Sequence, residues 1–153
     1  IGIIIGQLLG AGKTEEAADT DRKLIAFSIM VGVASGILLA FLAPIFPRLY
    51  NTTEGAKRIA MEMIFAHALC LPLFAFKNAT YFTLRSGGKI WVTIIFDSAF
   101  LWAVSVPIAF IISRFTAFSV VFIYLSVQAG DILKCILGFI LVKKRIWVKN
   151  IVD

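Results

Sequence analysis

The sequence predicts an all-α membrane protein with four transmembrane helices and the end of a fifth. Three observations lead to this fold class. Of the 153 residues, 60% are apolar, only 16% are charged, and several apolar stretches are long enough to cross a bilayer. A soluble domain averages about 45–50% apolar and about 25% charged residues. A chain of this size buries only about 70% of its surface on folding, so a soluble fold would leave large apolar patches in water.

The elements follow one another along the chain with short connections. The apolar stretch 1–9 is expected to be the end of a helix, and a polar connector, residues 10–23, follows it. Within the connector, Thr14 before Glu15 and Glu16 is typical of a helix N-cap with an acidic first turn, so a helix is expected to begin there. A span needs about 20 mostly apolar residues, and in lipid its backbone groups must be satisfied internally, which favours helices. The predicted spans are residues 24–46, 59–82, 90–112 and 115–142, followed by a basic tail at 143–153.

Prolines and glycines inside the spans predict how these helices bend and pack. Pro72 and Pro107 each remove a backbone donor within a span, so a kink is expected at both. Gly32 and Gly36 form a small-xxx-small pair, which lets a second helix approach closely.

The net charge of +6 is interpreted as a signal of membrane orientation. Nine basic residues flank the spans at residues 10–23 and 85–89 and in the tail, and four flank them on the opposite side. Because basic residues concentrate in cytoplasmic loops, we expect the first set, including the C-terminus, to be cytoplasmic. Trp91 and Trp147 lie near the same side, where an amphipathic ring is at home. The expected surroundings are therefore the lipid bilayer, with no nucleic-acid partner.

No pattern in the chain predicts catalysis. Gly12-Lys13-Thr14 ends like a phosphate-binding loop, but Gly6 is one residue too far from it to begin that motif. No Ser/His/Asp set or pair of catalytic carboxylates has a useful spacing, so we expect no enzyme and no cofactor. His67 and Cys70 are a single pair, which falls short of a metal site. Cys70 and Cys135 are interpreted as small apolar residues.

Ionisable residues inside the spans are the informative positions. The candidates are Lys77, Asp97, Asp131 and Lys134, with Glu62 and His67 nearer the opposite side. A charge at this depth costs at least about 2.5–3.5 kcal/mol, so such residues usually line a cavity or pair with one another. At about 1.5 Å rise per residue, the two acids and two lysines reach similar depths, and we expect an Asp–Lys pair across helices. Two interpretations remain: an ion or substrate pathway, or charge pairs that only hold the helices together.

Two short motifs stand at connectors: GQLLGAG at residues 6–12 and LRSGGK at residues 84–89. They resemble, in order, motifs of the multidrug and toxic compound extrusion (MATE) transporters. The first resembles the glycine-rich cytoplasmic loop after the second helix of a lobe, and the second resembles a later short loop. The basic tail, with its tryptophan, resembles the C-terminus of bacterial members. The residues carrying the two loop motifs are Gly6, Gln7, Gly10 and Gly12, then Arg85, Gly87 and Gly88.

The resemblance implies the C-terminal part of the second six-helix lobe of a transporter. Members of the family export organic cations and other drugs in exchange for H⁺ or Na⁺, so small organic cations and the missing N-terminal lobe are the implied partners. The implied location is a bacterial plasma membrane. Some members carry an aspartate on the tenth helix, whereas residues 70–84 contain no acid. Asp97 and Asp131 are then the acids deep in the membrane. The alternative is a non-transporting membrane component whose buried charges serve helix assembly.

Overall fold

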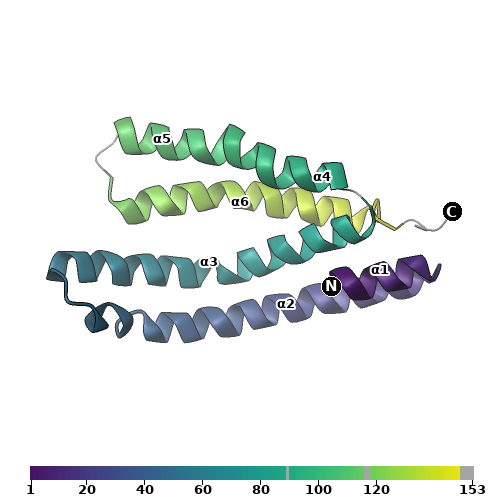
Figure 1. The fold of residues 1–153 in the computed structure, drawn as a ribbon, viewed down its shortest axis with the longest axis horizontal. Coiled ribbons are helices and arrows are strands. Elements are labelled where there is room, and N and C mark those ends of the chain that lie inside the picture. The colour runs from purple at the N-terminus through teal and green to yellow at the C-terminus, as the bar shows by residue number, and fades with distance from the viewer. Residues whose placement is uncertain (89, 116–117, 149–153) are drawn as a thin grey trace.

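The protein is a bundle of long antiparallel helices in the computed structural model, which describes residues 1–88, 90–115 and 118–148 (Figure 1). The helices are α1 (Gly2–Gly10), α2 (Thr14–Leu42), α3 (Glu54–Ser86), α4 (Ile90–Ile94), α5 (Val106–Phe115) and α6 (Val120–Lys143). Within these described ranges, four helical stretches are long and apolar enough to cross a membrane. The predicted fold class is therefore confirmed.

The first two helices meet at a tight turn. Helix α1 continues through Gly10, so Gly6, Gln7 and Gly10 are helical and the expected glycine-rich loop shortens to residues 11–13. Gly12 has a φ of +72°, a conformation in which glycine avoids the Cβ clash of other residues. The expected Thr14 cap is wrong: Thr14 is the first residue of α2, and no side chain caps this helix. The helix nevertheless begins where the sequence predicted.

Two other helices begin at side-chain caps. Thr53 Oγ1 accepts a hydrogen bond from the backbone N–H of Ala56 at 3.4 Å at the start of α3, and a short 3₁₀ turn, η1 (Phe46–Leu49), precedes it. Ser119 Oγ accepts from the N–H of Phe122 at 3.3 Å at the start of α6. Helix α6 therefore begins at Val120, later than the span boundary expected at residue 115.

The helical stretch from α4 to α5, residues 90–115, changes from α-helix to π-helix before Pro107. Two π-helical turns, η2 (Ile95–Ala99) and η3 (Leu101–Ser105), separate α4 from α5. Pro107 follows them at the second position of α5 and has no N–H with which to continue the α-helical pattern. Such π-helical turns often accompany functional sites.

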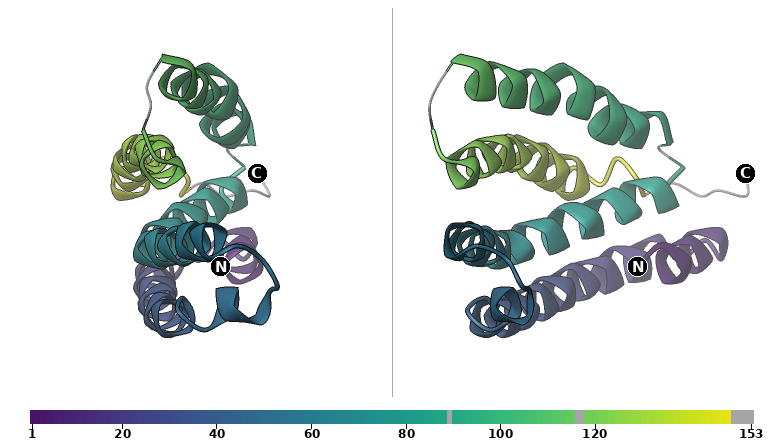
Figure 2. Two further views of the ribbon diagram at one scale, coloured as in Figure 1. Left: turned by 90° about the vertical axis from the view of Figure 1, so that its left-hand side faces the viewer. Right: turned by 60° about the vertical axis from the view of Figure 1, so that its left-hand side comes forward.

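Helix α3 is the central element of the bundle, between α2 on one side and α6 on the other (Figure 2). It changes direction midway, at the part of the helix that contains Pro72 (Figure 1). Gly32 and Gly36 of α2 lie directly against it. A Cβ added at Gly32 would lie 2.7 Å from Ala75 Cβ, and one at Gly36 would lie 2.6 Å from the carbonyl oxygen of Ala68. The predicted close approach of a second helix is confirmed.

Residues 144–148 pack into the end of the bundle formed by α1, the N-terminus of α2 and the C-termini of α3 and α6, called here the basic end. The indole of Trp147 is buried among Ile5, Leu9 and Leu84 and donates to the carbonyl of Val142 at 3.3 Å. Trp147 therefore lies inside the protein rather than at a lipid-facing position, because its indole folds back onto the last turn of α6.

Two further contacts hold the tail in place. The backbone of Trp147 lies so close to Gly87 that no Cβ fits there. Arg145, at a φ of +52°, reaches Glu15 of α2, with 2.7 Å between Nη1 and Oε1. The SGGK motif therefore has a packing role at Gly87, and Gly88 makes the turn with a φ of +74°.

The α2–α3 contact predicts different effects for alanine at two glycines. Alanine raises helix propensity by up to about 1 kcal/mol at either position, but only Gly36→Ala forces a Cβ against the Ala68 carbonyl. At Gly55, nothing lies within 4 Å of an added Cβ. Gly36→Ala should therefore unfold about 1–3 kcal/mol more easily than Gly55→Ala in detergent unfolding experiments. Equal stability of the two variants would contradict this account of the contact.

Candidate functional site

A group of three charged side chains lies between α3 and α6. Asp131 Oδ2 is 2.6 Å from Lys77 Nζ of α3, and Asp131 Oδ1 is 3.3 Å from Lys134 Nζ, one turn along α6. Asp131 and Lys134 are buried, and Lys77 is partly buried. The predicted Asp–Lys pair across helices is therefore confirmed.

Two aromatic rings contact the lysine ammonium groups in addition to the single carboxylate. Lys77 Nζ lies 4.9 Å from the ring centre of Phe74, and Lys134 Nζ lies 4.7 Å from that of Phe100. The negative face of an aromatic ring attracts a cation, most strongly away from water. The rings thus offset part of the charge imbalance, because two ammonium groups share one carboxylate.

Asp97 lies beside this group without joining it. Its side chain lines a cavity of about 290 Å³ together with Lys77 and Lys134, and Arg85 of the LRSGGK motif lines the same cavity. Asp97 is exposed and forms no ion pair with any residue that the structure describes. It comes from η2, the π-helical turn described above. Among the residues that the structure describes, the cavity is therefore lined by an acid without an ion pair and by two lysines that are already paired.

A second polar cluster lies on the same two helices, farther from the basic end. His67 Nδ1 is 2.7 Å from the hydroxyl of Tyr124, and Gln128 Nε2 donates to that hydroxyl at 3.0 Å. Sequence reasoning selected His67 but missed its partners. Tyr124, Gln128 and Asp131 are spaced by four and three residues, the spacing of one helical face, and that signal could have found them.

Glu62 is separate from both clusters. It pairs with Arg58, one turn earlier in α3, at 3.0 Å, and this pair is largely exposed.

Cys70 and Cys135 are free thiols. Within the ranges that the structure describes, no three His, Cys, Asp or Glu side chains are grouped so that they could hold a metal ion. The ionisable side chains described between α3 and α6 are instead held by ion pairs and hydrogen bonds.

These helices, with ionisable side chains between them, define a polytopic α-helical membrane protein. The MatE family model matches residues 1–111, and the chain therefore belongs to this family, as the motifs predicted. Over 145 residues the chain is 23% identical to multidrug and toxin extrusion protein 1 of Xenopus tropicalis. That alignment covers 95% of the chain and 25% of the relative, so the chain spans about a quarter of that protein. No solved structure matches the chain.

The Asp131 group predicts a large loss of stability when its carboxylate is removed. Asp131→Asn leaves two ammonium groups without a counter-ion between the helices, which should cost about 3–5 kcal/mol. Lys77→Met combined with Asp131→Asn should cost less than the sum of the single changes, because the two groups are coupled.

Unfolding of the full-length protein in detergent measures these differences. The matched control is Glu62→Gln, which breaks the exposed pair with Arg58 and should cost less than about 1 kcal/mol. Additive effects at Lys77 and Asp131, or an equal loss at Glu62, would show that the buried group is not a coupled unit.

Proposed function

We propose that this chain is part of a secondary transporter that exports xenobiotics or organic cations in exchange for H⁺ or Na⁺. Membership of the MatE family supports the transporter class. The relative's name, multidrug and toxin extrusion protein, supports the class of substrate. Because the chain spans only about a quarter of that relative, the activity belongs to a longer protein containing it.

The observation that carries the proposal is the free acid beside the paired charges. Asp97 lines the same cavity as Lys77 and Lys134 but pairs with neither. Alternating access needs a site whose ion occupancy differs between two states. An accessible carboxylate can take up H⁺, Na⁺ or an organic cation, and the neighbouring Asp131 group supplies lysines that can exchange partners. Asp97 is therefore proposed as the exchanging acid, with Asp131, Lys77 and Lys134 as its supporting charges.

We propose that His67 and Glu62 line the pathway without exchanging ions. His67 and Tyr124 extend the polar face of α3 and α6 away from the Asp131 group, so we assign them to the wall of the pathway. Glu62 pairs with Arg58 near the far end of α3, and we place it at the mouth of the pathway.

A second function is favoured by the burial of Asp131. Its two oxygens already bind Lys77 and Lys134, as expected of charges that serve only helix assembly in a non-transporting membrane component. The two functions differ at Asp97: it is essential for exchange and dispensable for assembly, because it makes no ion pair within the described ranges.

Substitution of Asp97 tests the proposal in the full-length protein. Asp97→Asn should reduce export of an organic-cation dye such as ethidium by more than about tenfold, the effect of losing one charged interaction worth about 1.4 kcal/mol or more. Protein amount and unfolding temperature should be unchanged. The matched control is Asp19→Asn, an exposed acid that pairs with Lys23 at 2.6 Å on α2.

Imposed gradients identify the coupling ion. Dye export driven by a proton gradient alone supports H⁺ exchange, and export driven by a sodium gradient alone supports Na⁺ exchange. Normal export by the Asp97→Asn variant would refute the exchanging role of Asp97. Absence of export from the unaltered protein under both gradients would favour the assembly function.

The orientation is proposed from the distribution of basic residues, with the basic end in the cytoplasm. Single cysteines at Thr52 and Glu16, both exposed positions, test it in a background with Cys70→Ala and Cys135→Ala. In intact cells an impermeant maleimide should label Thr52→Cys, and it should label Glu16→Cys only after permeabilisation. The reverse pattern would invert the orientation.

A further inference from the structure

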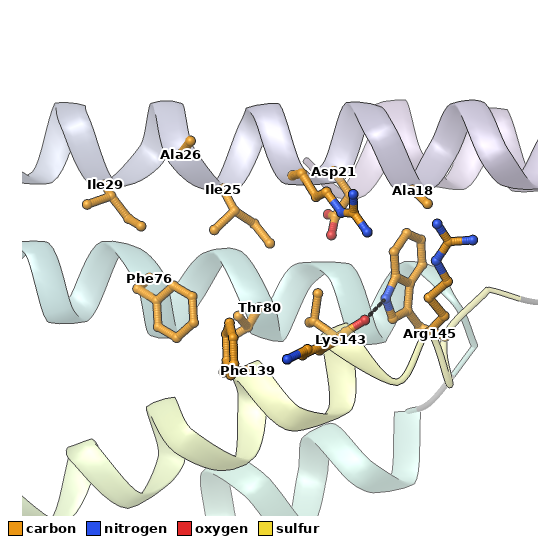
Figure 3. Close-up of a pocket in the computed structure, with 13 residues that line it drawn as sticks. Ala18, Asp21, Ile25, Ala26, Ile29, Phe76, Thr80, Phe139, Lys143 and Arg145 are labelled. Atoms are coloured by element: carbon orange, nitrogen blue, oxygen red, sulfur yellow. Dashed lines mark hydrogen bonds between the residues drawn. The ribbon is translucent and has the colours of Figure 1, made fainter.

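A cavity of about 470 Å³ opens between α2, α3 and α6 at the basic end, away from the Asp131 group (Figure 3). Its two ends differ in chemistry. Ile29 and Phe76 lie at one end, whereas Asp21 and Arg145 lie toward the other, with Lys143 across the cavity from Asp21 (Figure 3). The proposed transport function uses none of these residues.

Asp21 is the polar side chain that this cavity leaves unsatisfied. Its exposed fraction is 0%, and Thr83 Oγ1 donates to its Oδ1 at 2.6 Å. Its second oxygen, Oδ2, is buried and has no hydrogen-bond partner within the part of the chain that the structure describes. A buried carboxylate oxygen without a donor is costly, and native structures rarely retain one. A ligand that brings an N–H donor to this end of the cavity would satisfy it.

Three cationic side chains line the same cavity as Asp21. Arg22 and Lys143 form no ion pair among the residues described, and Arg145 shares its charge with Glu15. Lys143 Nζ also lies 5.7 Å from the ring centre of Phe139. Cations of this kind bind phosphate oxygens. The polar end therefore complements a ligand that carries both an ammonium group and a phosphate.

The apolar part of the cavity continues from this polar end along α2. Ile25 and Ile29 follow Asp21 at four and eight residues, on the same helical face. At about 1.5 Å rise per residue, Ile29 lies about 12 Å from Asp21 along the helix. Lys23 is the last charged residue of α2, and the apolar run of this helix begins directly after it. The polar end thus stands at headgroup level, and the apolar part extends toward the hydrocarbon.

We propose that this cavity binds an aminophospholipid such as phosphatidylethanolamine. The ammonium group donates to Asp21 Oδ2, the phosphate meets Arg22 and Lys143, and the first part of one acyl chain lies beside Ile29 and Phe76. A choline headgroup has no N–H for Asp21, and a glycerol headgroup has no positive charge. The proposal rests on the membrane location and the cavity, and it is independent of whether the protein transports.

Lipid binding to the full-length protein tests the proposal. The probes are phosphatidylethanolamine, phosphatidylcholine and phosphatidylglycerol with identical acyl chains, titrated onto delipidated protein and measured by native mass spectrometry. Phosphatidylethanolamine should bind about tenfold more tightly than the other two, the effect of one charged hydrogen bond. Asp21→Asn should abolish this preference, and Lys143→Gln should weaken all three lipids. The matched controls Asp19→Asn and Lys23→Gln change exposed residues of the same helix and should bind like the unaltered protein.

Three outcomes would overturn the proposal: equal affinity for the three lipids, a preference that Asp21→Asn leaves intact, or no bound lipid because another segment of the longer protein fills the cavity. Where Asp21→Asn fails to fold, stepwise N-methylation of the phosphatidylethanolamine headgroup decides the matter on the unaltered protein. Affinity should drop when the last N–H is lost, and an unchanged affinity across that series would also overturn the proposal.

Discussion

The carboxylate of Asp131, placed between two lysines, is the interaction on which the middle of this bundle depends. In an apolar environment an uncompensated charge is far more costly than in water. Asp131 therefore fixes the rotation and depth of α6 against α3, because only one register brings Lys77 Nζ within 2.6 Å of its oxygen. The aromatic contacts of Phe74 and Phe100 then follow from where the ammonium groups must lie.

The other faces of α3 are stabilised by close packing and by apolar contacts rather than by ion pairs. Helix α2 packs against it by close backbone approach at Gly32 and Gly36, where dispersion contacts replace the hydrophobic effect that lipid does not supply. At the basic end, the buried indole of Trp147 and the glycine contact at residue 87 close the bundle. Helix α3 is thus fixed by charge on one side, by shape on the other, and by a small apolar core at its C-terminal end.

The two cavities lined by Asp97 and by Asp21 differ in their surroundings. The cavity beside Asp97 lies among the charges that we propose to exchange partners during ion or cation passage. The cavity at Asp21 lies among apolar walls beneath a cationic rim, which suits an amphipathic ligand of the membrane. Both contain an acid that forms no ion pair within the described part of the chain. The environments nevertheless differ, because Asp97 is exposed and Asp21 is fully buried.

The sequence by itself determined the fold class, because long apolar runs in lipid have no alternative to the helix. It also determined that Lys77 and Asp131 lie at similar depths, since a constant helical rise converts residue number into depth. It did not determine which acid pairs, because rotation of α4–α5 relative to α6 is set by packing, and there Asp97 stays outside the ion pairs. The burial of Trp147 and the unsatisfied oxygen of Asp21 were decided only by tertiary structure. Both depend on contacts between residues 60 or more positions apart, such as Thr83 with Asp21 and Trp147 with Gly87, and local patterns in the sequence carry no record of such distant contacts.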